Sequence, residues 1–190
     1  MNSTISPALA IVLGAVVIIV LLATVAFIWW RERRSKQLRA RFGPEYLRSL
    51  EEIGNRHEAE ARLHRLEKRV ESLSIRALPP EEKARYAASW RKVQADFVDS
   101  PGEALNRADE LLGSVMEARG YPVSDFAQRS ADLSVDHAAV VQNYRAAHEI
   151  ALRHQRGEAD TEALRQAMIH YRALFAELVE EPEGARAKAS

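Results

Sequence analysis

Apolar residues recur at intervals of three and four through most of this chain, with charged residues between them. This spacing places the apolar residues on one face of an α-helix. Alternating runs of β-branched residues, which indicate strands, are missing from the sequence after residue 30. The pattern therefore predicts an all-α fold, in which a helical domain of about four to six helices occupies residues 44–180.

The apolar stripes of these helices predict which residues form the core. The stripe in residues 59–73 has the spacing of a coiled-coil seam, but it lasts for about two heptads only. We interpret it as a packing helix, with a seam between two copies of the chain as the alternative. The stripes are Tyr46, Leu50 and Ile53; Ala59, Leu63, Leu66, Val70 and Leu73; Tyr86, Trp90, Val93 and Phe97; Leu105, Ala108, Leu112 and Val115; Val140, Val141, Tyr144, Ala147, His148 and Ala151; and Leu164, Met168, Tyr171, Phe175 and Leu178.

Glycine, proline and capping residues predict where these helices begin and end. Glycine favours helix C-termini, whereas proline and small polar residues favour N-termini. The residues from Ser100 to Glu103 have the form of a capping box, and Ser134 is the expected cap of a long helix. The other expected ends are Gly43-Pro44, Gly54-Asn55, Leu78-Pro79-Pro80, Gly120, Gly157 and Asp160-Thr161. The last ten residues, 181–190, are small and polar, and we expect them to be disordered.

The first thirty residues carry no charged side chain, and residues 8–30 are apolar almost throughout. At about 1.5 Å per residue, a helix of this length spans about 35 Å, enough for a hydrocarbon core of about 30 Å. Its fourteen Leu, Ile, Val and Phe residues favour insertion by roughly 4 to 8 kcal/mol. Residues 8–30 are therefore predicted to form a transmembrane helix that follows a short N-terminus, residues 1–7.

The flanking residues decide between a retained anchor and a cleaved signal peptide. A signal peptide has its basic residues before a shorter apolar core, whereas here they follow a long one. Trp29 and Trp30 suit the membrane interface, and Arg31, Arg33, Arg34 and Lys36 follow directly. This basic segment, residues 31–43, predicts an inner-membrane protein with its N-terminus outside and residues 31–190 in the cytoplasm. Binding of these bases to anionic lipid, as in a membrane-surface sensor, is an alternative to their acting as a topology signal alone.

Charge and composition exclude several classes of function. The chain has 27 basic and 27 acidic residues, but six of the bases and one of the acids lie before residue 42. The remainder has a net charge of −5, which argues against a nucleic-acid-binding domain. The absence of cysteine removes thiolate chemistry and disulfides. The sequence also lacks GxSxG, HExxH and phosphate-loop motifs, so we predict no enzymatic activity and no cofactor.

The histidines suggest an alternative function. His137 and His148 fall about three turns apart on one predicted helix, which is too far for a shared metal ion. A second helix would have to bring His170 to them. A small-molecule or metal site near His137, His148 and His170 is therefore the alternative to an interaction module.

One region, which contains the irregular stretch 120–134 and extends to His137, is the best candidate for binding a partner. Irregular loops often carry recognition, and this one joins aromatic and acidic residues. The alternative is that its aromatic residues plug the end of the helical bundle. The candidate residues are Tyr121, Pro122, Phe126, Asp132, Asp136 and His137.

Several short runs carry a resemblance to a known family. The runs are RFGPEY (41–46), RGYPVSDF (119–126), ADLSVDH (131–137), NYRAAHE (143–149) and HYRALFAEL (170–178). Through them, residues 41–178 resemble a family of uncharacterised bacterial proteins with an N-terminal transmembrane helix and a helical region. The resemblance implies a recurring module and carries no activity. The predicted anchor, the amphipathic helices and the missing catalytic motifs favour a membrane-held interaction or scaffold protein, whose contacts are the lipid bilayer and an unknown protein partner.

Overall fold

The computed structural model describes residues 7–122 and 124–180, and those residues form eight helices without a strand. The chain divides into two compact units, residues 1–40 and 41–190. The prediction of an all-α fold is confirmed. Seven helices follow the first, so the prediction of four to six was too low. The expectations for residues 1–6 and for a disordered tail at 181–190 lie outside the described residues.

Helix α1 runs from Pro7–Phe42, so the apolar stretch and the basic segment belong to one helix. It ends where Gly43 adopts a φ of 47°, as the Gly43-Pro44 break predicts. In the described part of the chain, no helix has both the length and the apolar run that crossing a membrane requires. The transmembrane helix predicted for residues 8–30 therefore lacks support from that part.

Helices α2 (Pro44–Ile53) and α3 (Arg56–Glu71) form a hairpin. The turn uses the predicted residues: Gly54 ends α2 in the left-handed region at a φ of 72°, and the Asn55 side chain accepts hydrogen bonds from the first turn of α3. The hairpin buries residues of its own that are not part of the main hydrophobic core. They are Tyr46, Ala59, Leu63 and Val70.

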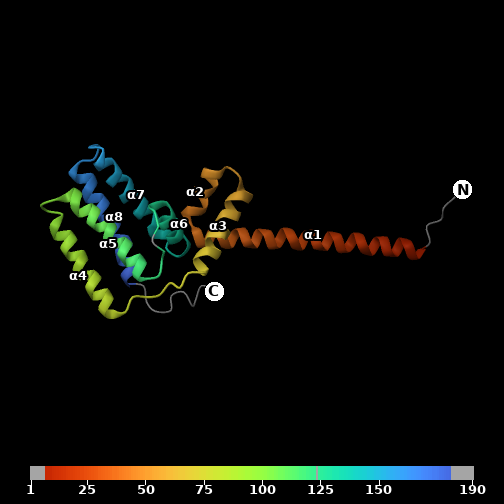
Figure 1. The fold of residues 1–190 in the computed structure, drawn as a ribbon. Coiled ribbons are helices and arrows are strands. Elements are labelled where there is room, and N and C mark those ends of the chain that lie inside the picture. The colour runs from red at the N-terminus through yellow and green to blue at the C-terminus, as the bar shows by residue number, and fades with distance from the viewer. Residues whose placement is uncertain (1–6, 123, 181–190) are drawn as a thin grey trace. The chain divides into compact units, whose positions relative to one another are not determined.

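The main core lies between α4 (Pro80–Asp96), α5 (Pro101–Ala118), α7 (Ala138–Gln155) and α8 (Thr161–Glu180), which pack against one another (Figure 1). The predicted stripes supply most of it. Trp90 of α4 stacks on Phe175 of α8 with 4.7 Å between ring centroids, and Tyr144 and Tyr171 are fully buried. Helix α6 (Phe126–Asp136) joins this bundle to the hairpin, because it packs against both α7 and α3.

Two predicted caps differ from the structure. Ser134 lies buried inside α6, and the long helix α7 starts four residues later, after His137. The hydroxyl of Ser134 instead donates a hydrogen bond to the carbonyl of Ala131, which is a common local bond of serine inside helices. Ser100 does precede α5 with a proline at the first position, but its side chain makes no capping bond. At α8, the Asp160 carboxylate accepts from the Ala163 amide at 2.8 Å, as predicted.

Candidate functional site

A cleft of about 290 Å³ lies between the α2–α3 hairpin and helices α6 and α7. It combines charged, hydroxyl and apolar side chains, which suits the recognition of another molecule. The residues that line it are Glu45, Arg48, Ser49, Glu52, Arg62, Leu63, Leu66, Phe126, Ala127, Ser130, Ala131, Ser134, Arg145, His148, Glu149 and Leu152.

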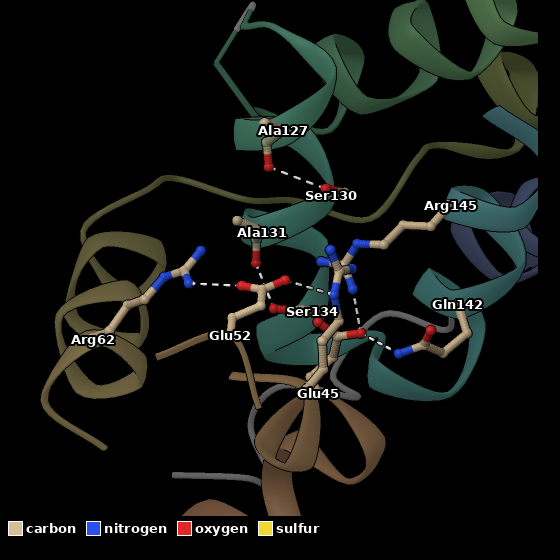
Figure 2. Close-up of polar contacts among 10 residues, drawn as sticks. Glu45, Glu52, Arg62, Ala127, Ser130, Ala131, Ser134, Gln142 and Arg145 are labelled. Atoms are coloured by element: carbon tan, nitrogen blue, oxygen red, sulfur yellow. Dashed lines mark hydrogen bonds and ion pairs between the residues drawn. The ribbon is translucent and has the colours of Figure 1, made fainter. Parts of the chain in front are cut away.

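At the inner end of the cleft, Glu45 joins the hairpin to helix α7. Glu45 stands in the first turn of α2 and is buried, with 6% of its side chain exposed. Its Oε1 accepts hydrogen bonds from Arg145 Nη1 and Gln142 Nε2, which project from neighbouring turns of α7 (Figure 2). A buried carboxylate needs such partners, because an unpaired buried charge costs several kcal/mol. This contact therefore fixes one side of the cleft.

Nearer the solvent, one carboxylate holds two arginines. Arg62 Nη1 of α3 donates to Glu52 Oε2 at 3.0 Å (Figure 2). Arg48 Nε donates to the other oxygen, Oε1, at 2.8 Å. Burial raises the pKa of Glu52, but the hydrogen bond from Arg62 and the charges of both arginines outweigh it and hold the pKa below its usual value. Glu52 therefore stays ionised and keeps the two guanidinium groups together.

The floor of the cleft is a row of small residues on α6. Ala127, Ser130, Ala131 and Ser134 follow one another at helical spacing on one face. Both serine hydroxyls donate to carbonyls three residues earlier, at 3.0 Å for Ser130 and 2.6 Å for Ser134 (Figure 2). Small side chains leave room for an apolar group to lie close to the α6 backbone.

An aromatic pair forms part of the wall. Phe126 stacks on His148 with ring centroids 3.6 Å apart and an angle of 9° between the rings. Burial lowers the pKa of His148 below its usual value, with the charge of Asp109 opposing and that of Arg129 adding to the effect. The imidazole is therefore neutral at pH 7, and the wall that it forms with Phe126 carries no charge.

Phe126 also contacts a buried polar cluster that does not line the cleft. Its ring lies 4.8 Å from that of Tyr144, and Arg129 Nη2 donates to Asp109 Oδ2 at 3.3 Å. Burial, followed by the charge of Asp109, raises the pKa of both Tyr144 and Tyr171. Neither phenol ionises near neutral pH, so this cluster contributes to packing between α5, α6, α7 and α8.

The six residues predicted to bind a partner lie mostly in the interior. Tyr121, Asp132 and His137 are buried, and Pro122 is half-buried. Asp132 bonds Arg69 at 3.0 Å, Asp136 bonds Arg41 at 3.3 Å, and His137 bonds Glu177 at 3.3 Å. Of the six, Phe126 alone lines the cleft.

The three histidines of the alternative site have different neighbours. His137 contacts Glu177, His148 stacks on Phe126, and His170 lies 3.1 Å from the side-chain oxygen of Asn143. In the part of the chain that the structure describes, no group of three or more His, Asp or Glu side chains is arranged to hold a metal ion. His148 is the one of the three that lines the cleft.

The sequence pattern does not predict the charged residues of the cleft. Arg48 and Glu52 are an (i, i+4) pair, which is a visible signal but a common one on helix surfaces. Glu45 and Arg145 are 100 residues apart, so nothing local in the sequence relates them. Their pairing depends on how α2 packs against α7.

No protein-family model matches this chain, and comparisons with curated proteins and with solved structures give no match. The resemblance of residues 41–178 to a family of bacterial single-pass membrane proteins therefore stays a prediction. The candidate site rests on the geometry of the cleft.

Proposed function

We propose that this chain is a membrane-anchored, non-enzymatic interaction module that docks a protein partner in the cleft between α2–α3 and α6–α7. The observation that carries the docking role is the composition of the cleft. The hairpin side carries charged residues beside Leu63 and Leu66, and the other side carries Phe126, His148 and Leu152 beside the charged Arg145 and Glu149. Protein interfaces combine apolar anchors with polar groups in this way.

The charges of the cleft support recognition over acid–base chemistry. Arginine side chains donate to both oxygens of Glu52 and to Oε1 of Glu45, so these three atoms are already engaged as hydrogen-bond acceptors. A general base needs a free oxygen within reach of the proton that it removes. Charged side chains arranged in this way instead give a surface its pattern of charge, which selects partners.

The proposed anchor is residues 8–30 of α1, with the N-terminus outside and residues 31–190 in the cytoplasm. The large apolar side chains from Val16 to Trp30 are exposed on every side of the helix, with exposed fractions from 51% to 64%. Such a surface suits a hydrocarbon environment. The guanidinium carbon of Arg33 lies 3.8 Å from the centre of the Trp29 ring, and Arg34 lies 5.3 Å from that of Trp30. Tryptophans paired with bases suit the headgroup region.

A photo-crosslinking experiment on the full chain in native membranes tests the docking role. p-Benzoylphenylalanine is placed at Leu152, which lines the cleft and is 41% exposed. The matched control places it at Val98, which is 81% exposed between α4 and α5. A discrete protein adduct from Leu152 that Val98 does not give supports the proposal. Equal labelling from both positions, or no adduct from Leu152, overturns it.

A further inference from the structure

Two half-exposed arginines of the cleft, Arg48 and Arg62, both bind the carboxylate of Glu52. The side chains of Arg48 and Arg62 are 43% and 50% exposed, and that of Glu52 is 40% exposed. Each guanidinium has five N–H donors, and Arg48 uses Nε and Arg62 uses Nη1 to bind Glu52. Both arginines therefore keep further donors for a second acceptor, and their bonds to Glu52 are solvent-exposed and weak.

The ion pair between Glu45 and Arg145 is more buried than the bonds of Glu52 and has a structural role. Glu45 and Arg145 have side chains that are 6% and 18% exposed, and Gln142 gives the carboxylate a further donor. This pair holds the hairpin to α7 and is not available for exchange. Glu52 is the carboxylate of the cleft that an incoming group can replace without leaving a buried charge unpaired.

The opposite side of the cleft presents two large apolar residues and an exposed acid. Phe126 and Leu152 face the cleft from α6 and α7, over the small residues of the α6 floor. Glu149 of α7 is exposed on the same side. Its negative charge repels a second acid there, so an acidic ligand group is directed toward the α2–α3 side.

We infer that the cleft binds an acidic amphipathic helix of a protein partner, with a partner carboxylate taking the place of Glu52 between Arg48 and Arg62. The apolar face of that helix lies on the α6 floor against Phe126 and Leu152. A groove between helices with apolar walls is a recurring way of binding one helix face. This inference rests on the docking role proposed above and adds the chemistry of the partner. Glu52 then acts as an internal competitor.

Substitutions in the crosslinkable full chain test this exchange. With p-benzoylphenylalanine at Leu152, Glu52→Gln removes the competing charge and is expected to raise adduct yield about two- to fivefold, the range of an exposed ion pair. The double change Arg48→Gln and Arg62→Gln is expected to abolish the adduct. Glu162→Gln, which breaks an exposed pair with Arg165 on α8, is the matched control and leaves the yield unchanged.

The crosslinked partner peptides provide the second readout. Mass spectrometry is expected to identify segments with apolar residues at helical spacing and acidic residues beside them. A thermal melt of each variant shows that the fold is retained. The inference is overturned if neither Glu52→Gln nor the double arginine change alters the adduct yield, or if the crosslinked peptides contain no acidic residues. Either result leaves the docking role intact. Absence of any Leu152 adduct instead overturns the docking role itself.

Discussion

Asp132 shows how a single buried charge ties two helices of this protein together. Its carboxylate is 1% exposed and accepts hydrogen bonds from Arg69 of α3 and Gln128 of α6, at 3.0 and 2.7 Å. Arg69→Ala leaves the carboxylate buried without its cation, so we expect a loss of about 2 to 3 kcal/mol in the free energy of unfolding. Urea unfolding followed by circular dichroism measures it. The control, Arg65→Ala on the exposed face of α3, should change stability by less than about 0.5 kcal/mol; equal effects would contradict this account.

Two histidines give stability a dependence on pH. Burial, and then the charge of Arg119, lowers the pKa of His137, although Glu177 opposes them; burial also lowers the pKa of His148. The folded protein binds protons at these two imidazoles less well than the unfolded chain does. The free energy of unfolding therefore does not depend on these histidines above about pH 6.5 and decreases as the pH falls below that value. Thermal unfolding from pH 8 to 5 measures the decrease. His148→Gln should make the loss of stability with falling pH smaller, whereas His57→Gln, at an exposed position, should leave it unchanged. A melting temperature of the unmodified protein that does not change from pH 8 to 5 would refute the prediction.

At the scale of the helices, the turn that follows α5 depends on Gly120. Its φ is +98°, and a Cβ atom there would lie 2.5 Å from the carbonyl oxygen of Ser74. Gly120→Ala therefore combines backbone strain with a clash, and we expect a loss of about 2 to 4 kcal/mol. Gly54→Ala is the matched control, because its φ is +72° but no atom lies within 4 Å of the added Cβ. Its loss should be about 1 kcal/mol, and the difference between the two thermal melts isolates the clash.

The helices and the cleft differ in how far the sequence predicts them. Periodic stripes and glycine breaks are local signals, so the core residues Trp90, Leu112 and Tyr171 and the turn at Gly54 were predicted and are confirmed. Ser134 was misassigned because serine bonds equally well to a carbonyl inside a helix as to the first amides of one. The cleft was not predicted, because it forms where α2 contacts α7 through Glu45 and Arg145 and where α3 packs against α6. These helices are far apart in the sequence, so no short-range pattern relates them.

At the scale of the whole molecule, the hairpin and the bundle should open independently. The hairpin has buried residues outside the main core, and the buried pair Glu45–Arg145 joins α2 to α7 of the bundle. Arg145→Gln should accelerate amide hydrogen exchange about tenfold or more in α2 and α3 and leave α5 and α8 unchanged. Arg156→Gln, which breaks an exposed pair at the end of α7, is the control. Uniform acceleration across all helices would contradict separate opening.

The proposed topology places most of the chain on the basic side of the apolar segment, because positive residues are retained in the cytoplasm. The sequence contains no cysteine, so labelling of a single introduced cysteine shows on which side of the membrane that residue lies. Val98→Cys is expected to resist a membrane-impermeant thiol reagent in intact cells and to react after lysis, since Val98 is 81% exposed. Ser3→Cys is the matched control and should react in intact cells. Labelling of the residue 98 cysteine before lysis would reverse the orientation, and recovery of the full chain in the soluble fraction would overturn the anchor.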